Sequence, residues 1–182
     1  APEVQVEGFA TGAEAFVTKP FDEEVMLSRI GALLEQRRKM QQKFLYSMDP
    51  AELEMIDDSQ DKKFMARVME VMKANYANPE FDTQSFIDEM GMSRSLLHKK
   101  LQNFVGETAN RFIRIYRLNI SRERIVRNAV NKNLNVSEIA YEVGFNDPKY
   151  FTRCFTKHFG YPPSAVPEAI VPDNGGTEDN NQ

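Results

Sequence analysis

The sequence predicts an all-helical domain over residues 63–166, preceded by a strand and a helix within residues 1–44. Apolar residues recur at helical spacing throughout 63–166, and glycine or capping residues separate these stretches. In addition, a short helix, a glycine turn and a second helix occur twice, with Gly91 and Gly144 at the turns. We expect residues 45–62 to be a linker and residues 167–182 to be a disordered acidic tail.

The N-terminal segment reads as one strand followed by one helix. Residues 15–18 are apolar and β-prone, and Lys19-Pro20 interrupts them. Asp22 is a suitable N-cap for a helix whose basic residues 37–39 lie near its end. Because one strand and one helix cannot bury a core, we expect this segment to need further chain upstream or a partner.

Six helices are expected between residues 63 and 166. The first helix ends at Asn78-Pro79, and the second is capped by Asp82 or Thr83. The third extends from Ser93 to Gly106, and the long fourth from Thr108 to about Asn131. The fifth extends from Val136-Ser137 to Gly144, and the sixth from Asp147-Pro148 to Gly160. The aromatic residues expected in the core are Phe86, Phe112, Phe151, Phe155 and Phe159.

Charge is distributed unevenly along the chain. Residues 1–61 hold 6 basic and 13 acidic side chains, a net charge of −7, whereas residues 62–166 hold 17 and 10, a net charge of +7. Residues 167–182 add −4, which gives the overall −4. A basic block between acidic flanks suggests a domain that binds a polyanion, although a solvated basic surface without a partner fits equally well.

Several function classes lack support. No carboxylate pair, catalytic triad or phosphate-binding glycine loop stands out, so we expect no enzyme and no cofactor. Two histidines and the single Cys154 make a structural zinc site unfavourable, and Cys154 fits a half-buried thiol in a reducing cytoplasm. The sequence has no run of about 18 apolar residues, so we expect no membrane span. We therefore expect a cytoplasmic protein, without membrane contact by this segment.

Each repeated unit resembles a helix-turn-helix, in which the second helix enters the DNA major groove. With the apolar residues facing inward, the outward stripe of the first such helix is Ser95, His98, Lys99 and Gln102, and that of the second is Lys149, Thr152, Arg153 and Thr156. These side-chain types can read base edges, and the flanking Arg94 and Lys100 suit phosphates. A single glycine turn between helices is common, and polar stripes are usually solvated faces. The helix-turn-helix hypothesis therefore rests on the occurrence of the whole pattern twice.

The second unit also resembles a family signature. Residues 139–163, IAYEVGFNDPKYFTRCFTKHFGYPP, are similar to the signature of AraC/XylS-type transcription regulators, and residues 91–101 resemble the family's first unit. The resemblance covers roughly residues 63–166 and implies two helix-turn-helix units joined by one long helix. It also implies base contacts by Ser95, His98 and Lys99 and by Lys149, Thr152 and Arg153, the stripes found above. Thr156 stands where that family usually has lysine.

The N-terminal segment resembles a different domain. Residues 8–21, GFATGAEAFVTKPF, look like the end of a phosphoacceptor receiver domain, of which they cover about the last third. The resemblance implies that Lys19 contacts the phosphoryl group of a phospho-aspartate and that Phe16 is the rotating aromatic of the switch face. The alternative is a plain turn at Lys19-Pro20.

These expectations combine into one hypothesis. The chain is expected to be the output end of a two-component response regulator or hybrid sensor within a phosphorelay, binding double-stranded DNA. We expect a homodimer when a full receiver is present, and RNA polymerase is a further candidate partner. The alternative is a helical module that binds an acidic protein partner. Charge alone would also allow RNA binding, but exposed stacking aromatics are not apparent.

Overall fold

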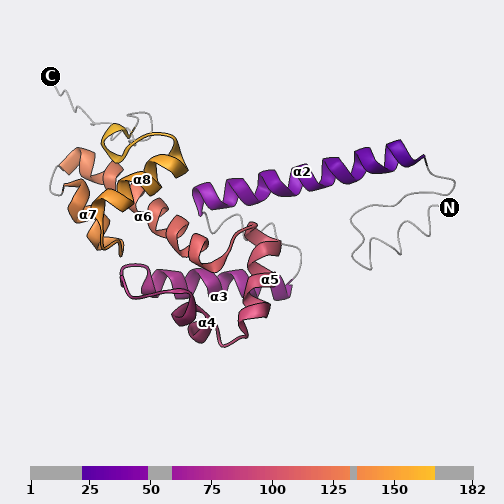
Figure 1. Cartoon of the computed structure of the whole chain (residues 1–182), viewed down its shortest axis with the longest axis horizontal. Helices are drawn as coiled ribbons and strands as arrows, with labels where there is room; N and C mark the ends of the chain where they lie inside the picture. The colour runs from indigo at the N-terminus through magenta and orange to yellow at the C-terminus, as the bar shows by residue number, and fades with distance from the viewer. Residues whose placement is uncertain (1–21, 49–58, 132–134, 167–182) are drawn as a thin grey trace, which may run out of the picture. The chain divides into compact units, whose positions relative to one another are not determined.

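The computed structural model describes residues 22–48, 59–131 and 135–166, and every regular element within these ranges is a helix (Figure 1). The chain divides into two units, Ala1–Met40 and Gln41–Gln182. The strand predicted at residues 15–18 and the tail predicted at 167–182 lie outside the described residues. The all-helical class predicted for residues 63–166 is confirmed.

The smaller unit contributes most of α2 (Glu23–Ser47). Asp22 begins this helix as predicted, because its carboxylate accepts hydrogen bonds from the amides of Glu24 at 2.8 Å and Val25 at 3.3 Å. Along this unit's part of α2 several large apolar side chains are exposed, namely Val25, Leu27, Ile30, Leu33, Leu34 and Met40.

The larger unit contains a first group of helices, α3 (Ser59–Asn75), α4 (Thr83–Met90) and α5 (Arg94–Val105). Asp82 and Ser93 cap α4 and α5 as predicted, and Gly91 and Gly106 end them with positive φ. Together with the long helix α6 (Ala109–Asn131), these helices bury an apolar core. In this core Phe86 of α4 and Phe112 of α6 stack with ring centroids 6.4 Å apart.

The long helix α6 (Ala109–Asn131) carries this first group near one end and the second group, α7 (Val136–Glu142) and α8 (Pro148–Phe159), near the other (Figure 1). A short 3-10 helix, η2 (Pro163–Ala165), packs on α8. Phe151 and Phe155 are fully buried in the second core, as predicted, whereas Phe159 is half-buried at its edge.

Residues 41–48 pack inside the larger unit. Phe44, Leu45 and Met48 are buried in the first core, and Gln41 Nε2 donates a 3.0 Å hydrogen bond to the Asn103 carbonyl. Helix α2 therefore continues to Ser47, past the basic residues 37–39 where the sequence suggests its end. The predicted limits 1–44, 45–62, 63–166 and 167–182 stay predictions, while the contacts divide the chain after Met40.

Candidate nucleic-acid interface

Helix α5 presents the first predicted stripe. Its N-cap Ser93 accepts a hydrogen bond from the Leu96 amide at 3.3 Å, and Leu97, Leu101 and Val105 fix its inner face in the core. This leaves Ser95, His98 and Lys99 exposed and Gln102 half-buried, all on the opposite side of the helix. Four of the predicted contact residues therefore share one accessible stripe.

Helix α8 presents the second stripe by the same logic. Asp147 accepts a 2.8 Å hydrogen bond from the Lys149 amide, and Pro148 occupies the first turn. Phe151 and Phe155 point into the core, so Lys149 and Arg153 are exposed and Thr152 is half-buried. The Thr152 hydroxyl donates to the Pro148 carbonyl at 2.9 Å, which leaves its methyl group and oxygen lone pairs for a ligand.

The two cations that flank the first stripe differ in their contacts. Arg94 is exposed, and its Nη2 donates a 2.8 Å hydrogen bond to Gln84 Oε1 on α4. Lys100 pairs with Asp61 on α3, 3.2 Å away, and its ammonium lies 5.0 Å from the centre of the Phe64 ring. Lys100 therefore faces α3, and its expected role at phosphates has no support in this arrangement.

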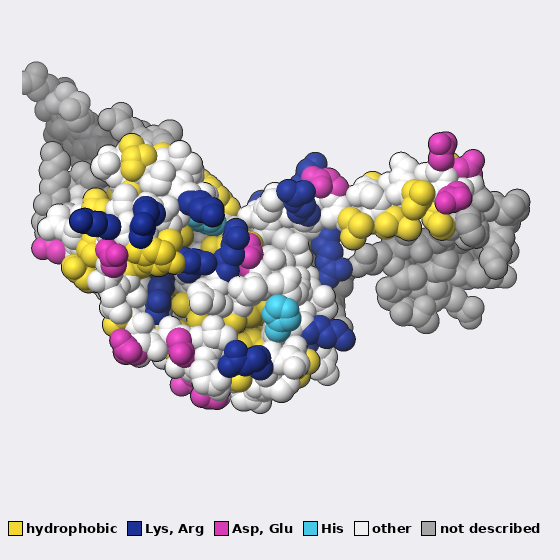
Figure 2. Space-filling view, in the orientation of Figure 1, with side chains coloured by type: hydrophobic (Ala, Val, Ile, Leu, Met, Phe, Trp, Pro, Cys, Tyr) yellow, Lys and Arg dark blue, Asp and Glu magenta, His cyan; other side chains and the backbone are white. Residues whose placement is uncertain are grey.

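An additional basic group adjoins α8. Arg114 on α6 donates a hydrogen bond to the Tyr150 phenol oxygen at 2.5 Å, and the Arg153 guanidinium lies 5.8 Å from the centre of the same ring. The sequence stripes do not include Arg114 or Tyr150, because this contact spans 36 residues and depends on the packing of α8 against α6. Figure 2 shows Lys and Arg side chains gathered over the part of the larger unit that contains α6 and α8.

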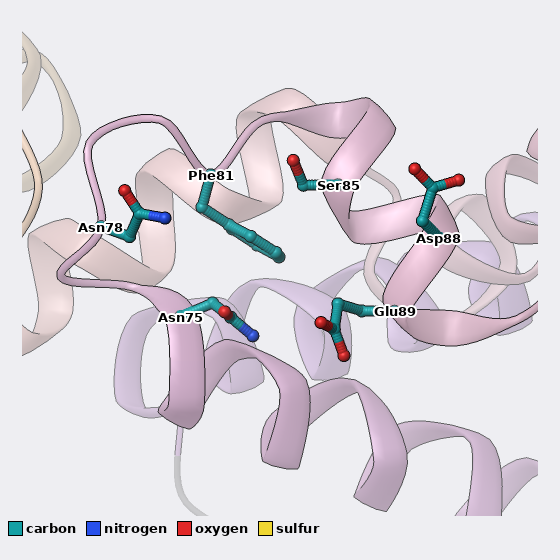
Figure 3. A pocket seen from close by; sticks show the side chains of 6 residues that line it. All are labelled: Asn75, Asn78, Phe81, Ser85, Asp88 and Glu89. Atoms are coloured by element: carbon teal, nitrogen blue, oxygen red, sulfur yellow. The ribbon is translucent and has the colours of Figure 1, made fainter.

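A polar hollow of about 460 Å³ lies between the end of α3, the turn that follows and α4 (Figure 3). Its lining consists of Asn75, Asn78, Phe81, Ser85, Asp88 and Glu89. It contains no basic side chain and two carboxylates, so it does not suit a phosphate or another anion. None of the predicted DNA-contacting residues lines it.

Neither a metal site nor a membrane-spanning helix occurs within the described ranges. No cluster of three or more His, Cys, Asp or Glu side chains there could hold a metal ion. Over the same residues, no helix is both long enough and apolar enough to cross a membrane. Lys19 and Phe16, which the receiver resemblance assigns to phosphate contact and switching, lie outside the described ranges, and their roles stay predictions.

Similarity to known protein families identifies the kind of helix-turn-helix domain. Residues 87–169 match a family described as a helix-turn-helix domain, and the matching relatives are AraC-family regulators and a histidine kinase. Residues 87–169 form an AraC-type helix-turn-helix domain. The predicted resemblance to AraC/XylS-type regulators is thereby confirmed. The AraC family is a family of DNA-binding transcription regulators rather than of enzymes.

Two curated relatives illustrate the range of this AraC-type domain. Histidine kinase P4 of Formosa agariphila is 34% identical over 158 residues, which is 87% of this chain but 11% of that protein. Transcriptional activator RhrA of Rhizobium meliloti is 31% identical over 103 residues, 55% of this chain and 31% of that protein. The chain thus spans only a small part of the length of either relative.

A solved structure shows the same fold. The C-terminal domain of AraT, a response regulator from Geobacillus stearothermophilus, superposes with a TM-score of 0.50 at 16% sequence identity. The match covers 65% of this chain and 94% of that one. It supports the arrangement of the AraC-type domain described above.

Proposed function

We propose that this chain is a sequence-specific DNA-binding transcription regulator that inserts α5 and α8 into successive major grooves. The observation that carries the proposal is the pairing of two capped helices, each fixed by a buried apolar face and each presenting an exposed polar stripe. The major groove admits an α-helix and presents a distinct donor and acceptor pattern for each base pair.

The side chains suit different parts of this readout. Lys99, Lys149 and Arg153 can donate to guanine O6 and N7, and the Thr152 methyl can pack against a thymine methyl. Ser95, His98 and Gln102 can provide shorter polar contacts on α5, and the exposed Arg94 can bind a phosphate. We therefore expect an asymmetric site of two short blocks, about one helical turn apart.

Selection of binding sites from a random duplex library tests this proposal directly. The full chain should enrich two blocks, and its affinity should fall steeply with salt because phosphate contacts release counterions. Lys99→Ala should relax one block and Arg153→Ala the other. Lys73→Ala, which removes an exposed lysine of α3 away from both stripes, is the matched control.

Two outcomes would contradict the proposal, and a third would favour the alternative function. Enrichment of no sequence, or relaxation of both blocks by Lys73→Ala, would contradict direct readout by α5 and α8. Binding of an acidic protein that survives Lys99→Ala and Arg153→Ala would favour the alternative interaction module, for which neither the fold nor the relatives give support.

We further propose that the domain is the output of a two-component protein. Support comes from the receiver-like residues 8–21 and from the match to histidine kinase P4 over most of this chain. Under this proposal Lys19 and Phe16 belong to the end of a receiver. Phosphorylation upstream would pair two copies, raise the effective concentration of the DNA-binding domains and present them to RNA polymerase.

Hydrogen exchange on the isolated chain tests the receiver proposal. Without the rest of a receiver, residues 1–40 should exchange rapidly, whereas the core helices α3 and α6 should be protected. Strong protection of residues 1–40 in a monomeric sample would contradict the proposal, because it would show that this segment is stable without further chain.

A further inference from the structure

Arg117 on α6 binds three backbone carbonyls at the end of α3 and in the turn that follows. Its Nε donates to the Tyr76 carbonyl at 2.9 Å, and its Nη2 donates to the carbonyls of Asn78 at 2.7 Å and Phe81 at 3.2 Å. A planar guanidinium can satisfy several acceptors at once, which a lysine ammonium cannot do in the same geometry. Arg117 therefore fixes the first helix-turn-helix unit to a defined point on α6.

Gly144, in the turn between α7 and α8, packs against that same point. It is buried with φ +85°, and a Cβ placed on it would lie 2.4 Å from the Tyr76 carbonyl oxygen and 3.0 Å from Arg117 Nε. The turn of the second unit thus lies directly on the carbonyl and the guanidinium that hold the first unit. Because Asp147 begins α8 three residues later, this contact also places the start of the second recognition helix.

A second connection lies two helical turns further along α6. Arg124 Nη2 donates to the Tyr76 phenol oxygen at 3.1 Å, and Nη1 of the same side chain pairs with Glu142 on α7. Tyr76 is therefore held at its backbone carbonyl by Arg117 and at its phenol by Arg124. Among the described residues, Tyr76 and Ile120 are the two that pack against both apolar cores.

The geometry points to a role for this junction in specificity. We propose that Arg117, Tyr76 and Gly144 set the distance and orientation between α5 and α8, and so determine the spacing that the two blocks of a DNA site must have. They act as positioning residues, because none of them lies on either polar stripe. This inference rests on the proposed DNA-binding function and extends it from base choice to spacing.

A library of duplexes tests the proposal with the two selected blocks held constant and their separation varied base pair by base pair. Arg117→Lys keeps the charge but loses the fork, and Tyr76→Phe removes only the phenol oxygen that Arg124 binds. Both should lower the preference for the best spacing over its neighbours by about fivefold, the equilibrium effect of one lost hydrogen bond. Base preferences within each block should not change.

Matched controls use exposed residues of the same types. Arg127→Lys, on the solvent side of α6, and Tyr141→Phe, on α7, should keep the spacing preference of the unaltered chain. A purely structural role predicts lower thermal stability in Arg117→Lys with an unchanged spacing preference. That result, in variants with native circular dichroism, would overturn the proposal.

A distance measurement covers the case in which Arg117→Lys does not fold. Spin labels at Ser95→Cys on α5 and Lys157→Cys on α8, in a Cys154→Ser background, report the separation of the two helices by pulsed electron resonance. Tyr76→Phe and Glu142→Gln should broaden a single narrow distance distribution, and an unchanged distribution in both would overturn the proposal. If the unaltered chain enriches no two-block site, the proposed function fails, while this measurement still decides whether the junction fixes the helices.

Discussion

The side-chain amide of Asn119, buried in the middle of α6, donates a 2.8 Å hydrogen bond to the carbonyl of Leu45 near the end of α2. The same Nδ2 group donates to the Ile115 carbonyl at 3.1 Å, so both of its hydrogens are used. Leu45 is itself buried, and its carbonyl belongs to the last turn of a helix, where intrahelical partners are missing. Asn119 therefore joins residues 41–48 to the DNA-binding domain.

Replacing Asn119 by alanine should lower the free energy of unfolding by about 1–3 kcal/mol, because the Leu45 carbonyl would stay buried without its donor. Urea unfolding followed by circular dichroism measures this loss. Asn110→Ala, at an exposed position in the first turn of α6, should change the stability much less. Equal losses in the two variants would contradict a specific role for the contact with Leu45.

Removing residues 1–48 should destabilise the chain far more than removing residues 1–40. The longer deletion removes the buried side chains of Phe44, Leu45 and Met48, each of which contributes about 1.5–3 kcal/mol when fully buried. The shorter deletion removes only residues of the smaller unit. Comparison of the two urea midpoints is the measurement, and identical midpoints would show that residues 41–48 do not belong to the folded domain.

The local elements were predictable because their signals lie within a few residues. Asp82, Ser93 and Asp147 cap the helices that they were expected to cap, and Gly106 and Gly160 end theirs. The capping box of Asn135 with Glu138 at the start of α7 is an equally local signal in the sequence.

The long-range contacts of α6 were not predictable in this way. Arg117 reaches carbonyls up to 41 residues away, and Asn119 reaches one 74 residues away, so neither has a sequence pattern. Lys100 is the converse case, in which a local position suggests one contact and long-range packing supplies others. Its place beside the first stripe suggests a phosphate contact, but the packing of α3 against α5 supplies Asp61 and Phe64 as partners.

Gly144 and Gly160 provide a matched pair for substitution by alanine. Both have positive φ, +85° and +83°, so both variants carry the strain of a left-handed backbone, about 1 kcal/mol. A Cβ at Gly160 would meet no atom within 4 Å, whereas one at Gly144 would meet the Tyr76 carbonyl at 2.4 Å. Thermal unfolding should therefore show a modest loss for Gly160→Ala and a much larger loss, or failure to fold, for Gly144→Ala. Similar losses would contradict the close approach.

Stability should depend on pH through His158. Burial lowers the pKa of His158 from its ordinary value of 6.5, and the nearby cations Arg111 and Arg122 act in the same direction. The unfolded chain then binds a proton at a higher pH than the folded chain does. The contribution of His158 to stability should therefore be constant above pH 6.5 and become unfavourable as the pH falls from 6.5 through the lowered pKa of the folded state.

The variant His158→Phe isolates this dependence. Within the described part of the chain, the buried Nε2 of His158 has no hydrogen-bond partner, so phenylalanine leaves no donor or acceptor unsatisfied there. Urea midpoints between pH 5 and 8 should decline on the acid side more steeply for the unaltered chain than for His158→Phe. The same decline in both chains would assign the pH dependence to other groups.

Arg114→Ala should impair the reading of one DNA block only. The Arg114 guanidinium holds the phenol of Tyr150, and the ring of Tyr150 lies beneath the Arg153 guanidinium, so loss of Arg114 leaves both side chains less restrained. Discrimination at the block read by α8 should fall by about fivefold, while that at the α5 block is retained. Affinities for duplexes altered in one block at a time measure both effects.

Tyr150→Phe, which keeps the ring under Arg153 but loses the hydrogen bond, should give a smaller loss at the same block. Equal losses at the two blocks would indicate that Arg114 contributes only its positive charge.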